Sequence, residues 1–100
     1  MAAHALAIVL KERGRLDAAE RLLRETLDAR RSILGPGKRE TLTSLVELAR
    51  IRVLRGDREE AANLLAQAVA TGYDFSAIAE DPVLSGIRLE SGITETPTAP

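Results

Sequence analysis

Apolar side chains recur at intervals of three and four positions along most of the chain. The pattern is clearest between residues 16 and 32, where the apolar positions are Leu16, Ala19, Leu22, Leu23 and Leu27. Such spacing places these side chains on one side of an α-helix. An alanine-rich run over 2–13 and two further amphipathic runs over 39–55 and 58–70 predict three more helices.

Glycine and proline interrupt the pattern at the end of each predicted helix. Gly14 follows the first helix, Gly35-Pro36-Gly37 follows the second, Gly56 follows the third and Gly72 follows the fourth. Proline has no N–H with which to continue a helix, and glycine adopts backbone angles that other residues avoid, so both residues mark turns. The chain is therefore predicted to fold as helices joined by tight turns.

Two aspartates stand where further helices are expected to begin. Asp57 precedes the fourth helix and has Glu60 three residues on, which is the spacing of a capping box. Asp81-Pro82 combines an N-cap residue with proline at the first helical position, and this predicts a short closing helix after residue 81. Residues 91–100 are rich in Thr, Pro and Gly and are predicted to be disordered.

The second half of this pattern repeats the first half at a fixed distance. Gly14 and Gly56 lie 42 residues apart (56 minus 14), and at the same offset apolar residues match apolar residues. The matched pairs are Leu6/Leu48, Ala7/Ala49, Ala19/Ala61, Leu22/Leu64, Leu23/Leu65 and Leu27/Val69. Each unit is a helix, a glycine turn and a second helix, and one such unit cannot bury its apolar face by itself.

These features predict an all-α fold, an α-α superhelix of about two helix-turn-helix repeats with a short C-terminal capping helix. The first repeat is expected over about 1–34, the second over about 39–72, and a closing segment over 73–90. Together they form one helical repeat domain over 1–90, and a disordered tail over 91–100 follows it.

The spacing of small residues and glycine within each unit resembles a known family. A Leu-Ala pair is followed seven residues later by glycine and, five residues after that, by alanine. This pattern resembles the tetratricopeptide repeat (TPR), in which small residues mark the close crossing of the two helices of a unit. The resemblance implies that Ala7 crosses Ala19 and that Ala49 crosses Ala61, in a TPR-like solenoid.

Two longer stretches extend the resemblance. The 42-residue period and the connection ILGPGKRETLTSL are similar to the repeats of kinesin light chains and of many bacterial multidomain proteins. The stretch GYDFSAIAEDPVLSGIR resembles the segment that closes such arrays in bacterial proteins, some of them serine/threonine kinases with C-terminal repeats. The resemblance therefore implies a bacterial protein whose repeats end in this closing segment.

Composition narrows the range of functions. Hydrophobic residues make up 45% of the chain and are nearly all Ala, Leu, Ile and Val, which suits closely packed helices. The net charge is −1 and there is no cysteine, so we expect neither a basic nucleic-acid footprint nor disulfide or thiolate chemistry. The longest apolar run, from Ala5 to Leu10, is too short to span a bilayer. We expect a cytoplasmic protein that binds neither nucleic acid nor membranes.

The sequence offers no convincing site for catalysis, a metal or a cofactor. His4 is the only histidine, and metal or acid–base sites need further partners at suitable spacing. The stretch from Gly35 to Lys38 differs from a phosphate loop, which has four residues between its glycines and follows a strand. Carboxylates such as Glu59 and Glu60 fall at turns, helix starts or exposed faces. We therefore expect a protein that is not an enzyme and has no cofactor.

The resemblance to TPR proteins implies one binding surface. In that family the first helix of each unit lines a concave groove that holds an extended or helical segment of a partner protein. Carried over by position, the groove residues are His4, Ile8, Lys11, Thr43, Val46, Arg50 and Val53. Lys11 and Arg50 would make this groove mildly basic, which suits an acidic or C-terminal carboxylate ligand. The alternative is that the apolar members are core residues and that the cations only solubilise the surface.

The first predicted helix is apolar on almost all sides, so it is expected to need neighbours on more than one side. This favours a non-catalytic protein–protein interaction scaffold that binds a protein or peptide, and that forms a homo-oligomer through residues 2–13 or belongs to a longer array. The alternative is a purely structural role, in which the chain caps the C-terminal end of a larger multidomain bacterial protein such as a serine/threonine kinase with C-terminal repeats.

Overall fold

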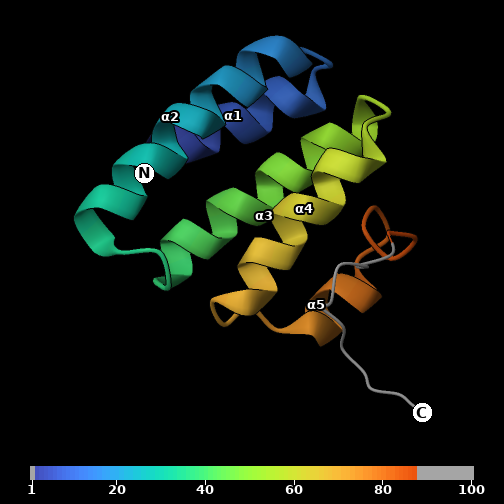
Figure 1. The fold of residues 1–100 in the computed structure, drawn as a ribbon. Helices are drawn as coiled ribbons and strands as arrows, with labels where there is room; N and C mark the ends of the chain where they lie inside the picture. Colours follow the sequence, from blue (N-terminus) through green and yellow to red (C-terminus); the bar gives the residue numbers. More distant parts are fainter. Residues whose placement is uncertain (1, 88–100) are drawn as a thin grey trace.

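The structure, a computed structural model, describes residues 2–87, and these residues fold into five α-helices (Figure 1). The helices are α1 (Ala2–Glu12), α2 (Leu16–Leu34), α3 (Arg39–Leu54), α4 (Arg58–Ala70) and α5 (Phe75–Glu80). The prediction of an all-α helical repeat with a short closing helix is confirmed. The predicted tail over 91–100 and the end of the closing segment lie outside the described residues.

The four long helices form two hairpin-like pairs that lie side by side (Figure 1). α1 packs against α2, α2 against α3 and α3 against α4, so each of these helices contacts the one that follows it. Because α3 has a neighbour on both sides, nine of its 16 residues are buried. α3 is therefore the central helix of the fold.

Gly14 and Gly56 end the first helix of each unit in the same way. Their backbone φ angles are +80° and +85°, a left-handed conformation that glycine adopts without steric cost. In both turns the residue after the glycine donates its N–H to a carbonyl five residues earlier, at 2.8 Å. The 42-residue period of the sequence therefore corresponds to a repeated backbone geometry.

The start of α4 forms one of the two hydrogen bonds of the predicted capping box. The Asp57 carboxylate accepts the backbone N–H of Glu60 at 3.1 Å, so the N-cap is confirmed. The backbone N–H of Asp57 donates to the carbonyl of Arg52 and leaves the Glu60 side chain without its expected role. In a full capping box the Asp57 N–H would donate to the Glu60 side chain. In this turn the same N–H is already bonded to the Arg52 carbonyl.

The closing helix lies earlier in the sequence than predicted. α5 begins directly after Asp74, whose carboxylate accepts a backbone N–H from its first turn at 2.9 Å. Asp81 also accepts two backbone N–H groups, those of Val83 and Leu84, but these residues form a turn. The prediction of a helix after residue 81 is therefore wrong. Too few residues stand between Asp81 and Gly86 to repay the cost of starting a helix.

One hydrophobic core joins the two units and the closing segment. Ala7, Ala19, Ala49 and Ala61, the small residues singled out by the TPR resemblance, are all fully buried. The larger side chains of the same cluster are Leu23, Leu27, Leu42, Leu45, Val46, Leu48, Ile51, Leu64, Leu65, Ile78 and Leu84. Since this cluster draws on α1 through α4 and on the residues that follow them, the closing segment is an integral part of the fold.

Candidate functional site

The seven predicted partner-binding residues lie on α1 and α3. Six of them are half-buried, and these are His4, Ile8, Lys11, Thr43, Arg50 and Val53. Val46 is only 2% exposed and belongs to the hydrophobic core, so its placement on an open groove is corrected. The packing of α3 between two neighbours, which the spacing of apolar residues does not reveal, explains this difference.

The two cations that were expected to make this surface basic are both paired with carboxylates. The Lys11 ammonium group lies 3.2 Å from a carboxylate oxygen of Glu47 on α3. Arg50 forms ion pairs with Glu47 and with Asp81, and its Nε donates to Asp81 Oδ2 at 3.1 Å. We call these four side chains the Lys11–Asp81 network; it runs from α1 across α3 to the turn after α5. Its two positive and two negative charges cancel.

Sequence reasoning missed the acidic half of this network. Glu47 stands three residues before Arg50 on one helix, a spacing that brings side chains together and could have indicated the pair. Asp81 is 31 residues from Arg50, and no sequence pattern relates them. Only the folding of the closing segment against α3 places that carboxylate beside the guanidinium.

The Lys11–Asp81 network changes the acidity of Asp81 and of Arg50. Burial by itself raises the pKa of the Asp81 carboxyl, but the hydrogen bonds from Arg50 and the Val83 N–H, with the charge of Arg50, bring that pKa below its ordinary value. Burial also opposes the charged form of Arg50, but the bond to Asp81 and the charge of Glu47 raise the pKa of its guanidinium. Both groups are therefore charged at neutral pH.

His4 lies on α1 close to this network. Its Nδ1 atom is buried and has no hydrogen-bond partner among the described residues. Burial is the main cause that lowers the pKa of His4 below 6.5, and the positive charge of Arg30 lowers it further, against the opposing charge of Glu47. His4 is therefore an uncharged part of the surface at pH 7.

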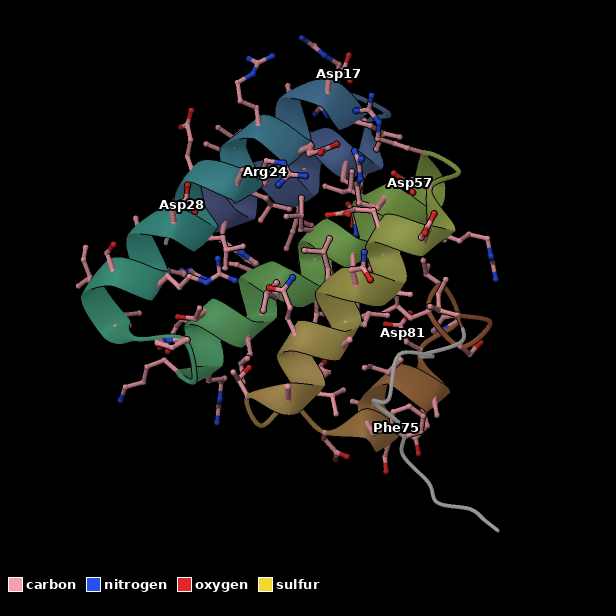
Figure 2. All side chains as sticks on the ribbon, viewed as in Figure 1. Asp17, Arg24, Asp28, Asp57, Phe75 and Asp81 are labelled. Atoms are coloured by element: carbon pink, nitrogen blue, oxygen red, sulfur yellow. The ribbon has the colours of Figure 1, made fainter. Side chains whose placement is uncertain are left out.

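A second group of charges joins α2 to the end of α3. Arg52 donates to the two carboxylate oxygens of Glu20 at 2.9 and 2.8 Å and to Asp57 at 2.9 Å. Glu20 also accepts two bonds from Arg24 on its own helix. Figure 2 shows two members of this group, Arg24 on α2 and Asp57 at the start of α4. Because Arg52 lies on α3 and Glu20 lies on α2, their ion pair links these two helices.

The outer face of α1 differs from the equivalent face of α3. Leu6 and Val9 of α1 are 52% and 44% exposed. At the 42-residue offset their equivalents are Leu48 and Ile51, and both are fully buried. α2 packs against α3 on the side of the preceding unit, whereas no helix of the described residues precedes α1. The structure therefore leaves α1 with an exposed apolar face.

Comparison with protein families identifies both units of the chain. Residues 1–71 match the family model described as Tetratricopeptide repeat. The chain belongs to the tetratricopeptide repeat family. The match ends just after α4, so the closing segment of this TPR protein lies outside it. No curated protein and no solved structure matches the chain.

Two further findings concern the described part of this TPR protein. Among residues 2–87, no group of three or more His, Cys, Asp or Glu side chains is placed to hold a metal ion. None of the five helices is both long enough and apolar enough to cross a membrane.

Proposed function

We propose that this TPR protein is a non-catalytic scaffold that binds other proteins, and that the outer face of α1 is part of its binding surface. The observation that carries this proposal is the exposure of Leu6 and Val9, whose equivalents Leu48 and Ile51 are buried. Fully burying one leucine or valine side chain contributes about 1.5–3 kcal/mol. A partner that covers both residues of α1 therefore gains binding free energy from them.

A second copy of the same chain is the partner that we propose for the outer face of α1. Equal patches on two copies can pack against each other about a twofold axis, and each copy then covers the other. Ala5, Leu6 and Val9 are all exposed on α1, and the small side chain of Ala5 allows two helices to approach closely. The proposed assembly is a homodimer through α1.

Light scattering over a concentration series tests this assembly. The wild-type chain should reach the mass of a dimer, and Leu6→Glu should return it to the mass of a monomer because the contact would bury an unpaired charge. Leu54→Glu is the matched control, since Leu54 is 51% exposed but lies at the end of α3. A wild-type chain that remains monomeric at every concentration would reject the homodimer.

We propose a second contact surface at the half-buried residues that α1 and α3 share. An arriving peptide meets the apolar side chains of Ile8 and Val53 with the Lys11–Asp81 network between them. Because Glu47 already accepts from Lys11 and Arg50, an acidic group on the peptide competes with it for both cations. The other residues proposed for this surface are His4 and Thr43. Substituting Glu47→Gln should therefore strengthen the binding of an acidic peptide, and an unchanged affinity would contradict this arrangement.

The second candidate function is a structural one, in which the chain closes the C-terminal end of a larger multidomain bacterial protein. The observation that favours it is the packing of the closing segment beside α3 and α4 (Figure 1). Ile78 and Leu84 are buried in the common core, and Arg58 of α4 donates to the carbonyl of Gly86 at 2.9 Å. A repeat array whose last helix is covered in this way does not extend at that end.

Two substitutions, together with the mass of the wild-type chain, separate the two functions. Leu84→Glu should detach the closing segment, because a charge cannot replace a fully buried leucine. If the chain is only an end-piece, wild type is monomeric and Leu84→Glu makes it associate through the uncovered side of α4. If the chain is an interaction scaffold, wild type already associates and Leu6→Glu abolishes that association.

A further inference from the structure

Four arginines surround a hollow of about 380 Å³ between the start of α2 and the end of α3. We call it the arginine hollow, and its lining consists of Asp17, Glu20, Arg21 and Arg24 of α2 with Arg52 and Arg55 at the end of α3. Asp17 and Arg24 are labelled in Figure 2. Four guanidinium groups and two carboxylates give this lining a formal charge of +2.

One carboxylate at the arginine hollow is shared by three guanidinium groups. Glu20 accepts from Arg24 and from Arg52, and the Nη1 atom of Arg55 lies 3.4 Å from Glu20 Oε1. The Glu20 side chain is 13% exposed, whereas Arg24 is 48% and Arg55 is 33% exposed. Since each guanidinium has five N–H groups, these three arginines have more donors than one carboxylate can accept. Donors on Arg24 and Arg55 are therefore open to a further anion.

The other acidic groups close to the arginine hollow leave this surplus in place. Asp17 pairs with Arg55, but the Asp17 side chain is 80% exposed, so water screens this pair. Asp57 pairs with Arg52, and the charge of Glu60 also acts on Arg52, so these two acids at the start of α4 mainly neutralise that one arginine. Even so, the Arg52 Nε atom is buried without a hydrogen-bond partner among the described residues.

The repeat does not require charges at these positions of its second helix. At the 42-residue offset, the α4 residues that correspond to Glu20, Arg21 and Arg24 of α2 are Ala62, Asn63 and Ala66. All three are uncharged, and α4 packs against α3 without an ion pair from them. The cluster of arginines is therefore a feature of this one junction between units.

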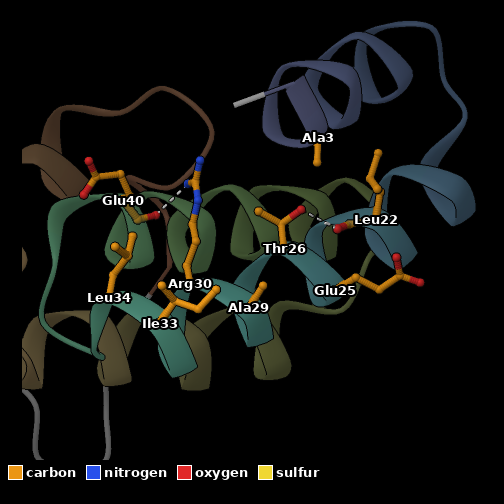
Figure 3. A pocket seen from close by; sticks show the side chains of 9 residues that line it. All are labelled: Ala3, Leu22, Glu25, Thr26, Ala29, Arg30, Ile33, Leu34 and Glu40. Atoms are coloured by element: carbon orange, nitrogen blue, oxygen red, sulfur yellow. Dashed lines mark hydrogen bonds between the residues drawn. The ribbon is translucent and has the colours of Figure 1, made fainter.

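A second hollow has the opposite balance of charge. The hollow drawn in Figure 3 has a volume of about 620 Å³, and its charged lining residues are Glu25, Arg30 and Glu40. One cation stands there against two carboxylates, and the remaining lining is mostly apolar. Of these two hollows, only the arginine hollow would attract an anion.

We propose that the arginine hollow binds a phosphate group, supplied either as free phosphate or by a phosphorylated side chain. Guanidinium groups bind phosphate through pairs of parallel N–H···O bonds. The phosphate of a phosphorylated residue carries about −1.5 to −2 charge at pH 7 and has three acceptor oxygens, so it can bind several arginines at once. A carboxylate ligand would bring only the single charge and two oxygens that Glu20 already provides. The site does not depend on the proposed scaffold function.

Titration with inorganic phosphate, at an ionic strength held constant with chloride, tests the site. The Nε–H signals of Arg24 and Arg55, followed by NMR, should shift to a plateau with phosphate and should not shift when chloride replaces it. Arg24→Gln should weaken binding about tenfold or more, because a charge-assisted bond is lost. The matched control is Arg39→Gln, which removes an exposed arginine at the other end of α3 and should leave binding unchanged.

Glu20→Gln distinguishes a phosphate site from a purely structural ion pair. If the arginines only link α2 to α3, Glu20→Gln lowers the melting temperature, and phosphate does not restore it. If the arginine hollow binds phosphate, phosphate raises the melting temperature of Glu20→Gln by more than that of wild type, because the competing carboxylate is gone. Each variant is compared with itself in phosphate and in chloride, so a general loss of stability does not mimic this result.

Phosphoserine peptides with randomised flanks, and the same peptides without phosphate, distinguish the two sources. A phosphopeptide that binds at least about tenfold more tightly than inorganic phosphate, and that is weakened by Arg24→Gln, identifies a phosphorylated side chain. Equal affinities identify free phosphate. The proposal is overturned if neither probe binds, if phosphate and chloride shift the same signals alike, or if Arg24→Gln and Arg39→Gln weaken binding equally. Light scattering tests the scaffold function separately.

Discussion

Leu6 and Leu48 stand at the same position of the two repeat units, but Leu6 is half-exposed and Leu48 is fully buried. The two residues share a residue type, a helix position and a place in the 42-residue period. They differ only in what packs against them, since α2 covers the side of α3 that faces the first unit. This difference between equivalent residues is the reason for assigning a binding surface to α1.

Substituting each leucine with alanine should lower the free energy of unfolding by different amounts, because the two leucines lie in different environments. Leu48→Ala creates a cavity in the core and should lower the free energy of unfolding by about 2–5 kcal/mol. Leu6→Ala removes a half-exposed side chain and should cost less than about 1 kcal/mol. Urea denaturation followed by circular dichroism, at a concentration where the chain is monomeric, measures both values. Equal losses would mean that Leu6 is as well packed as Leu48.

Asp81→Asn should remove a pH-dependent part of the stability. The pKa of Asp81 is lowered in the folded chain, so its stabilising effect is complete above the unfolded value of 3.8 and is lost as the pH falls through the lower folded value. Asp81→Asn should therefore cost about 1–3 kcal/mol at pH 7. The difference from wild type should shrink below about pH 4.

Denaturant titrations at several pH values measure this difference. The control is Asp28→Asn, since Asp28 is exposed on α2 and forms none of the ion pairs found within residues 2–87. If Asp81→Asn and Asp28→Asn had the same small effect at pH 7, the bond between Arg50 and Asp81 would not contribute to stability.

His4 should titrate below pH 6.5. Burial is the largest cause that lowers the pKa of His4. The positive charges of Arg30, the N-terminus and Lys11 lower this pKa further, while the negative charge of Glu47 raises it. Because the folded pKa is lowered, the contribution of His4 to stability is complete above pH 6.5 and is lost as the pH falls through the folded value. As His4 is the only histidine, a proton NMR titration measures it directly.

Two variants assign the causes of this shift. Arg30→Met should raise the midpoint of the His4 titration because a positive charge is removed, and Glu47→Gln should lower it further because a negative charge is removed. A midpoint at 6.5 in the wild-type chain, unchanged in both variants, would show that His4 is fully hydrated and lies away from both groups.

Gly14→Ala and Gly56→Ala should destabilise the chain by similar amounts. Both glycines have a positive φ, and an alanine there costs roughly 1–2 kcal/mol of backbone strain. An added Cβ meets nothing within 4 Å at either position, so no steric clash adds to that cost. Thermal unfolding of the two variants tests this equality. A loss at only one position would show that the two turns are not equivalent in solution.

Local patterns explain why much of the fold could be predicted. The three-and-four spacing, the glycine turns and the Asp57 cap depend on residues that are close in sequence, and they placed α1 to α4 correctly. The closing helix was misplaced because α5 has only six residues, which is too short for periodicity to indicate it. The same chemistry at Asp74 and Asp81 caps a helix in one case and a turn in the other.

The sequence by itself determined the helices, the turns and the two-unit repeat, because each of these depends on short-range spacing and backbone preference. Tertiary structure alone decided which equivalent residues are covered, as Leu6 and Leu48 show. It also decided that Val46 is core, that Asp81 neutralises Arg50 and that Arg30 is buried and forms no ion pair within residues 2–87. The physical reason is that burial and charge pairing depend on contacts between residues far apart in the chain, and those contacts exist only once the helices have packed.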